Sequence, residues 1–154
     1  MAIFNQTTPT VVPTDVFGWE VNTDVGYGRE TFTILGATAQ KPVKVGSVLA
    51  LDYSSMTATF ANVNDIGRLG VFVGRDLPTN PATSQDFERL SMTADGKGVL
   101  IVKGDGSSIL KRGYLNFGGV QYYKLNDEQR GDIDDSFTNR NRFKMVDQQY
   151  TPTV

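Results

Sequence analysis

The chain has 154 residues, of which 39% are hydrophobic, with a formal net charge of −2 and a sequence pI of about 5.1. This size is typical of one domain with a substantial core plus an arm or tail. The slightly acidic balance disfavours a general nucleic-acid binder or a polybasic membrane patch, because both need clustered basic side chains. The chain has no Cys and no His, which excludes disulfides, thiolate or imidazole metal sites and Ser-His-Asp catalysis.

The first 29 residues differ in character from the rest. Pro9 and Pro13 fix φ and push each preceding residue toward an extended conformation, so we predict an extended N-terminal arm over 1–29 and a β-rich domain over 30–154. A merely solvated tail would be polar and charged, whereas this arm carries apolar anchors. These are Ile3, Phe4, Val11, Val12, Val16, Phe17 and Trp19. The segment Val16–Val21 is also consistent with a first core strand. The opening residues, MAIFNQ, lack the basic and apolar regions of a secretory signal.

Alternating apolar and polar residues then predict half-buried strands. In the clearest case Val43, Val45, Leu49 and Leu51 fall on one face of an extended chain. The same alternation recurs along the first half of the domain and is followed by a polar, proline-containing loop. We expect strands near 30–35, 43–51, 57–61 and 69–75, and an exposed loop over 78–86.

The second half of the domain begins with a predicted hairpin. Leu90 and Met92 alternate with polar residues, and Asp95-Gly96 is a dipeptide that accepts the positive φ of a type I′ turn. The hairpin is expected to return along Val99–Lys103, which has the composition of a strand buried on both faces. A second turn is expected at 104–106.

One helix is expected near the C-terminus. Asn126 can cap it, and Gln129 three residues later is the matching capping-box residue; Gly131 predicts that the helix is short or split. Residues 126–137 hold one Arg against five acids, or −4, and residues 138–154 hold three cations against one acid, or +2. These blocks could pair within a subunit or between subunits. The last segment, Arg142–Val154, is expected to close the sheet.

Candidate acidic sites are weak. Asp132, Asp134 and Asp135 form the densest carboxylate cluster, but they lack the ligand spacing of a calcium loop. Asp52 and Asp76 follow strands and could pair as the acids of a glycosidase, although Asp at a strand end is usually a turn former. We therefore predict no metal site and no catalytic residues.

Two further patterns are also weak. Gly26-Tyr27-Gly28 lacks the third glycine and the strand–helix context of a dinucleotide-binding loop, and a joint between arm and domain explains it better. Tyr122 and Tyr123 could belong to a base-stacking surface, but the acidic pI favours core aromatics. We expect no cofactor and no enzymatic activity.

The stretch from Ile34 to Phe117 resembles the bacteriophage lambda head decoration protein family. The order and spacing of its segments carry the resemblance, which covers a little over half of the chain. The segments are a strand ending in Gly36-Ala37, KVGSVLAL at 44–51, a polar strand at 57–61, GRLGVFVG at 67–74, VLIVKG at 99–104 and the stretch 109–117.

The resemblance implies a fold and a function. The fold is a small, mostly antiparallel β-barrel or sandwich (β-tulip-like) with one short helix and an extended arm. The function is that of a non-enzymatic virion protein, made in the host cytoplasm, which stabilises the expanded phage capsid against DNA pressure. It would sit as a homotrimer at three-fold sites on the outer capsid surface, bound to the major capsid protein.

In that family the N-terminal arm adds a strand to a capsid-protein sheet, a mode in which backbone hydrogen bonds give affinity. The resemblance therefore gives the apolar residues of the arm, from Ile3 to Trp19, the role of binding the capsid. No nucleic-acid or membrane partner is expected. The alternative interpretation is a β-barrel binding module of a phage tail, either an OB-like nucleic-acid domain or a carbohydrate-binding domain.

Overall fold

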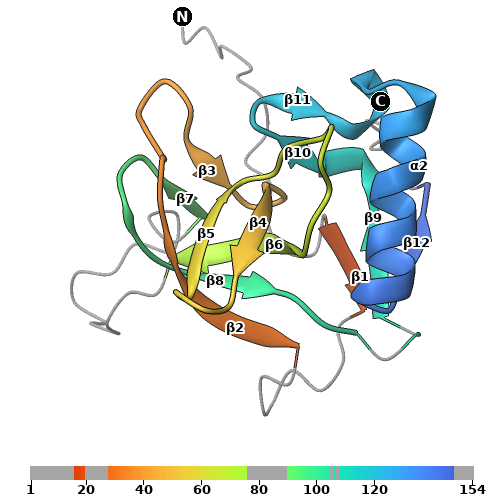
Figure 1. Cartoon of the computed structure of the whole chain (residues 1–154), viewed down its shortest axis with the longest axis horizontal. Helices are drawn as coiled ribbons and strands as arrows, with labels where there is room; N and C mark the ends of the chain where they lie inside the picture. The colour runs from red at the N-terminus through yellow and green to blue at the C-terminus, as the bar shows by residue number, and fades with distance from the viewer. Residues whose placement is uncertain (1–15, 20–27, 76–89, 105, 107, 148–154) are drawn as a thin grey trace, which may run out of the picture.

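The structure, a computed structural model, describes residues 16–19, 28–75, 90–104, 106 and 108–147 (Figure 1). Short strands are the main secondary structure among these residues, and one α-helix is present as well. The strands are β1 (Phe17–Trp19), β2 (Arg29–Ile34), β3 (Val43–Lys44), β4 (Val48–Asp52), β5 (Thr57–Phe60), β6 (Leu69–Arg75), β7 (Ser91–Met92), β8 (Gly96–Ile101), β9 (Ser108–Lys111), β10 (Asn116–Phe117), β11 (Val120–Gln121) and β12 (Phe143–Val146). The prediction of a small, mostly β protein with one short helix is confirmed.

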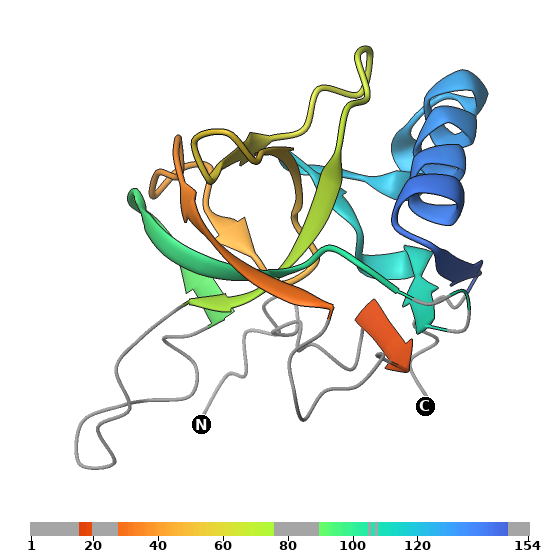
Figure 2. The ribbon, with the colours of Figure 1, turned by 60° about the horizontal axis from the view of Figure 1, so that its bottom comes forward.

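Five strands form a closed barrel in the order β2-β5-β4-β6-β8, which Figure 2 shows nearly end-on. Every pair is antiparallel except β2 with β5, which run parallel and complete the ring. Inward side chains of alternating residues fill the interior, as expected for a barrel of this size. Phe32, Ile34, Leu49, Phe72 and Leu100 are at most 1% exposed. The barrel interior is therefore filled by packed side chains and does not enclose a ligand cavity.

The predicted strand 43–51 is interrupted. Gly46 has φ +94°, so β3 ends before it and β4 begins after it. Ser47 stabilises the turn because its hydroxyl accepts a hydrogen bond from the Lys44 amide at 2.9 Å. Alternation alone did not reveal the break, since Val43, Val45 and Leu49 still have the spacing of one face. The prediction of one continuous strand is wrong, and the glycine is the reason.

The predicted hairpin at Asp95-Gly96 is also wrong. β7 pairs with β3 and not with β8, and Gly96 is already the first residue of β8. Instead of forming a turn with its neighbours, Asp95 accepts a hydrogen bond from the distant Gly36 amide at 2.9 Å. The return strand overlaps the predicted stretch 99–103, but β8 begins at Gly96 and ends at Ile101. Leu100, Ile101 and Val102 are buried, whereas Lys103 is exposed, so burial on both faces is confirmed only for the middle of the predicted stretch.

A second, open sheet has the order β1-β9-β12, with β1 antiparallel and β12 parallel to β9. Val16 is fully buried and Phe17 is 6% exposed. The Phe17 ring packs edge-on against Phe143 with centroids 5.7 Å apart. These two residues therefore belong to the core, and their assignment to a capsid-binding arm is wrong. The alternative of a first core strand describes them correctly.

The remainder of the predicted arm falls largely outside the described residues. Ile3, Phe4, Val11 and Val12 lie there, so their predicted role stays a prediction. Trp19 is described as part of β1, where its backbone is in register with Ile109. The predicted division at residue 29 does not separate β1 from the domain, because β1 packs on β9.

The helix α2 (Asp127–Asp135) begins as predicted. The Asn126 side chain accepts a hydrogen bond from the Gln129 amide at 2.8 Å, and the Gln129 side chain accepts one from the Asn126 amide at 3.2 Å. The acids of the first turn suit the positive end of the helix dipole. The chain continues through a π-helical turn, η4 (Ser136–Arg140), into β12. Figures 1 and 2 both place α2 on the side of β9 and β12. The last strand thus extends the second sheet and does not close the barrel.

Candidate functional site

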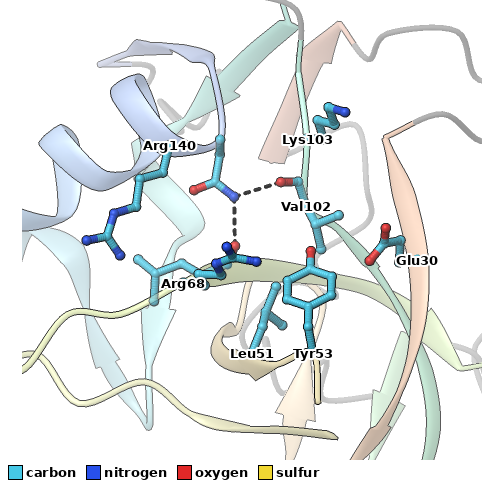
Figure 3. Close-up of a pocket in the computed structure, with 9 residues that line it drawn as sticks. Glu30, Leu51, Tyr53, Arg68, Val102, Lys103 and Arg140 are labelled. Atoms are coloured by element: carbon cyan, nitrogen blue, oxygen red, sulfur yellow. Dashed lines mark hydrogen bonds between the residues drawn. The ribbon is translucent and has the colours of Figure 1, made fainter. Parts of the chain in front are cut away.

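An open cavity of about 680 Å³ lies where one end of the barrel meets the turn after α2 (Figure 3). Its apolar residues are Leu51, Leu69 and Val102, from the ends of β4, β6 and β8. Its polar residues come from barrel strands, from the loops beside them and from η4. They are Glu30, Tyr53, Arg68, Lys103, Arg140 and Asn141.

Asn141 fixes one wall of this cavity. Its Nδ2 donates hydrogen bonds to the Leu69 carbonyl at 2.7 Å and to the Val102 carbonyl at 2.8 Å (Figure 3). The side chain thereby joins the start of β6 to the end of β8. It is 5% exposed, and among the described residues its Oδ1 has no hydrogen-bond partner. A buried acceptor left in this state costs roughly 1–3 kcal/mol, so the position calls for a donor.

Tyr53 holds Arg68 at the cavity. The Arg68 guanidinium lies over the Tyr53 ring, with 5.1 Å between Cζ and the ring centroid. Tyr53 in turn meets Phe32 edge-on, with centroids 5.3 Å apart. Partial burial, the negative charge of Glu30 and a hydrogen bond with it raise the pKa of Tyr53. The Tyr53 ring therefore supports the Arg68 guanidinium, and Phe32 in turn supports the Tyr53 ring.

The charge of the cavity is opposite to that of the chain. Arg68, Lys103 and Arg140 against Glu30 give three cations and one anion, or +2, whereas the whole chain carries −2. Arginine presents several donors in a planar fork that matches a carboxylate or phosphate. The cationic part of the lining is therefore suited to the recognition of an anion.

A second polar cluster has a structural arrangement. Arg112, in the short 3₁₀ helix η2 (Arg112–Tyr114), makes two hydrogen bonds to the Asp134 carboxylate, at 3.2 and 3.3 Å, and one to Asp147 at 3.0 Å. The Tyr122 hydroxyl donates to Asp134 at 2.7 Å, and the Tyr123 hydroxyl donates to Asp147 at 2.9 Å. These five residues, the Arg112 cluster, tie α2 and the end of β12 to the segment after β9.

Two of the acidic candidates, Asp52 and Asp134, make structural contacts. Asp52 accepts hydrogen bonds from the amide and hydroxyl of Ser54 at 3.0 and 2.6 Å, which hold the pKa of Asp52 below its usual value. It is a turn former. Asp134 belongs to the Arg112 cluster, and no group of three potential metal ligands occurs within the described ranges. Asp76 lies outside these ranges.

The other candidates from the sequence are the tyrosine pair Tyr122-Tyr123 and the glycine segment 26–28. Tyr122 is buried and Tyr123 is partly buried, so both are packed aromatics, as the acidic pI favoured. Gly26 and Tyr27 lie outside the described residues. The cavity residues Arg68, Lys103 and Arg140 were not singled out from the sequence. They lie at least 35 residues apart in the chain, and no local motif contains them together.

In the part of the chain that the structure describes, no helix is long and apolar enough to cross a membrane. Comparison of the chain with protein-family models, with curated proteins and with solved structures found no match.

Proposed function

We propose that this chain is a virion structural protein, a decoration protein that binds the outer surface of an expanded phage capsid as a homotrimer and contacts the major capsid protein. The observation that carries the proposal is the attachment of the N-terminal segment. Val16 and Phe17 are buried in the core, so the described chain begins in a strand that is packed against the domain. A segment joined to such a strand can transmit force from a partner to the barrel.

The barrel supports the same proposal. Its interior is filled by side chains such as Phe32, Phe72 and Leu100, each at most 1% exposed. Well-packed protein interiors have low compressibility and transmit strain. A solid, closed barrel is suited to a cementing role, and the segments that carry the family resemblance supply four of its strands, β4, β5, β6 and β8.

Energetics explain why the proposed binding requires several arms. Burying Ile3, Phe4, Val11 or Val12 would contribute roughly 1.5–3 kcal/mol each. Ordering each backbone residue costs about 1–2 kcal/mol, so four apolar side chains cannot alone order fifteen residues. Strand hydrogen bonds and linked binding must add to them. In a trimer the second and third arms bind at high effective concentration, which makes attachment tight.

The test uses the full-length chain, because truncation before residue 20 would also remove β1. In the arm variant, Ile3, Phe4, Val11 and Val12 are all changed to Ser. We expect a trimer of unchanged thermal stability that binds expanded capsids at least about tenfold more weakly. The measurement is co-sedimentation with expanded and unexpanded shells of the major capsid protein from the phage that encodes the chain.

The matched control changes Thr7, Thr8 and Thr10 to Ser, which alters the same segment and removes only one methyl group at each position. It should bind as the parent does. Equal binding of the arm variant would reject the arm as the gripping element. A parent protein that stays monomeric and ignores expanded capsids, but binds oligonucleotides or glycans, would reject decoration in favour of a binding module.

A further inference from the structure

We infer that the cavity lined by Arg68, Lys103 and Arg140 is a groove that binds an acidic peptide segment of a partner protein. The inference concerns the cavity alone and holds whether or not the partner is a capsid. At about 680 Å³, the cavity lies in the range of established ligand sites, and it is large enough for several residues of an extended chain.

The cations are placed for an extended ligand. In Figure 3 the side chains of Arg140 and Lys103 lie on opposite sides of Arg68, and the three cations do not converge on one point. A compact anion would need converging donors. Successive carboxylates along a peptide can each meet one cation, and arginine can bind a carboxylate through two parallel hydrogen bonds.

The central cation is positioned in advance. Arg68 is exposed, but its guanidinium rests on the Tyr53 ring at 5.1 Å, and Phe32 supports that ring from the barrel core. An arginine held in this way loses less conformational entropy when it binds a ligand. The stack therefore holds the Arg68 guanidinium at the cavity before a ligand binds.

The cavity also offers acceptors. Glu30 lines it, and the Asn141 Oδ1 is buried there without a partner among the described residues. A peptide can satisfy both kinds of group, because it carries backbone N–H donors as well as acidic side chains. A nucleic-acid strand fits less well, because its sugar-phosphate backbone has no N–H donors for Glu30 and the Asn141 Oδ1. A sugar would find the Tyr53 ring already occupied by Arg68.

Binding is measured by fluorescence anisotropy with the full-length protein and a fluorescein-labelled peptide, GDEDEG, at low salt. We expect saturable binding that is absent with the amide peptide GNQNQG. Arg68→Gln should weaken binding about tenfold, because a hydrogen bond to a charged group raises the binding affinity by about that factor. Arg140→Gln, at an exposed position, tests the second cation without disturbing the core and should also weaken binding.

The matched control is Arg130→Gln, which removes an arginine on α2 that does not line the cavity; it should bind as the parent does. A double variant, Arg68→Glu with Arg140→Glu, should lose GDEDEG and gain the basic peptide GKRKRG. Binding of GDEDEG that is equal in all variants, or no binding at all, would overturn the inference. Tighter binding of hexathymidylate or of a heparin hexasaccharide would also overturn it and assign the groove to that ligand class.

Discussion

At the scale of single residues, Gly46 and Gly119 show two separate reasons for a glycine: a positive φ and a lack of space for a Cβ. Gly46 and Gly119 have nearly the same backbone conformation, with φ of +94° and +98°. A Cβ on Gly46 would overlap the Tyr114 carbonyl oxygen, whereas a Cβ on Gly119 would meet nothing within 4 Å. Gly46 is also fixed by its own hydrogen bonds, since its amide donates to the Phe72 carbonyl at 3.1 Å. It is therefore needed for both conformation and space.

Changing each glycine to Ala should separate these effects. Gly119→Ala should lower the free energy of unfolding by about 1–2 kcal/mol, the cost of a left-handed residue with a Cβ. Gly46→Ala should cost roughly 1–3 kcal/mol more, because the neighbouring backbone must move. Urea unfolding followed by circular dichroism measures both values. Equal losses in the two variants would show that the close approach to Tyr114 carries no cost.

At the scale of elements, the Arg112 cluster joins segments that backbone pairing alone leaves apart. Burial and a hydrogen bond to Asp147 raise the pKa of Tyr123 to about 12 from an ordinary value of 10.0. Burial and Asp134 likewise raise the pKa of Tyr122. Hydrogen bonding from Tyr123 and the charge of Arg112 lower the pKa of Asp147. The cluster therefore favours protonated tyrosines and an ionised Asp147 in the folded state.

The pH dependence of stability follows from these directions. A raised tyrosine pKa stabilises the fold fully below pH 10, and this contribution disappears as the pH rises through about 12. The free energy of unfolding should therefore fall over this interval, and Tyr123→Phe should make the fall shallower, because phenylalanine does not titrate. At the acid end, the contribution of Asp147 disappears as the pH drops below 3.8, and Asp147→Asn should remove it. Urea titrations at stepped pH values test both; unchanged slopes in the variants would contradict the assignment.

Elements were predictable where local chemistry determines them. The α2 start follows from Asn126 and Gln129, whose reciprocal hydrogen bonds involve only neighbouring residues. The Asp95-Gly96 turn was predicted by the same kind of local rule but was wrong, because Asp95 is used by the distant Gly36 amide and β8 finds its partners in β2 and β6. Tertiary pairing outweighed the local preference of the dipeptide.

At the scale of the whole molecule, the barrel and the second sheet share one hydrophobic core. Phe17 of β1, Phe137 of η4 and Phe143 of β12 are all at most 6% exposed and belong to the same cluster as the barrel residues. Asn141 adds a polar link, because its amide reaches carbonyls at the ends of β6 and β8. The described residues should therefore unfold as one cooperative unit.

The variant Phe17→Ala tests whether the barrel and the second sheet unfold together. The variant should lose about 3–5 kcal/mol of unfolding free energy, as expected for removing a buried aromatic ring, while keeping a single transition with one m-value. Val120→Ala, at a site 42% exposed, is the control and should change the value by less than about 0.5 kcal/mol. Two separate transitions in Phe17→Ala, by circular dichroism and tyrosine fluorescence, would show that the second sheet melts independently.

The cavity could not be predicted from the sequence, because its cations come together only in the whole molecule. Arg68 precedes β6, Lys103 follows β8 and Arg140 ends η4, so only the completed fold brings them to one place. The barrel class was predictable because short apolar segments such as 69–73 recur between turns. The alternation of Leu69, Val71 and Val73 missed that β6 is buried on both faces, since Gly70 and Phe72 are buried too. The packing of β1 was left open because Val16 and Phe17 are equally suited to an arm or a core.

The closure of the barrel also sets an order of events during synthesis. β2 pairs with β8 in a register that joins Arg29 to Ile101 and Ile34 to Gly96, so the ring spans more than sixty residues of chain. Bringing such distant segments together costs loop entropy before any contact repays it, which makes topologies of this kind slow to fold. On the ribosome, β2 has to wait for β8 to emerge, and until then its apolar side chains lack half of their partners. Chaperone capture during that interval would protect the nascent chain from aggregation.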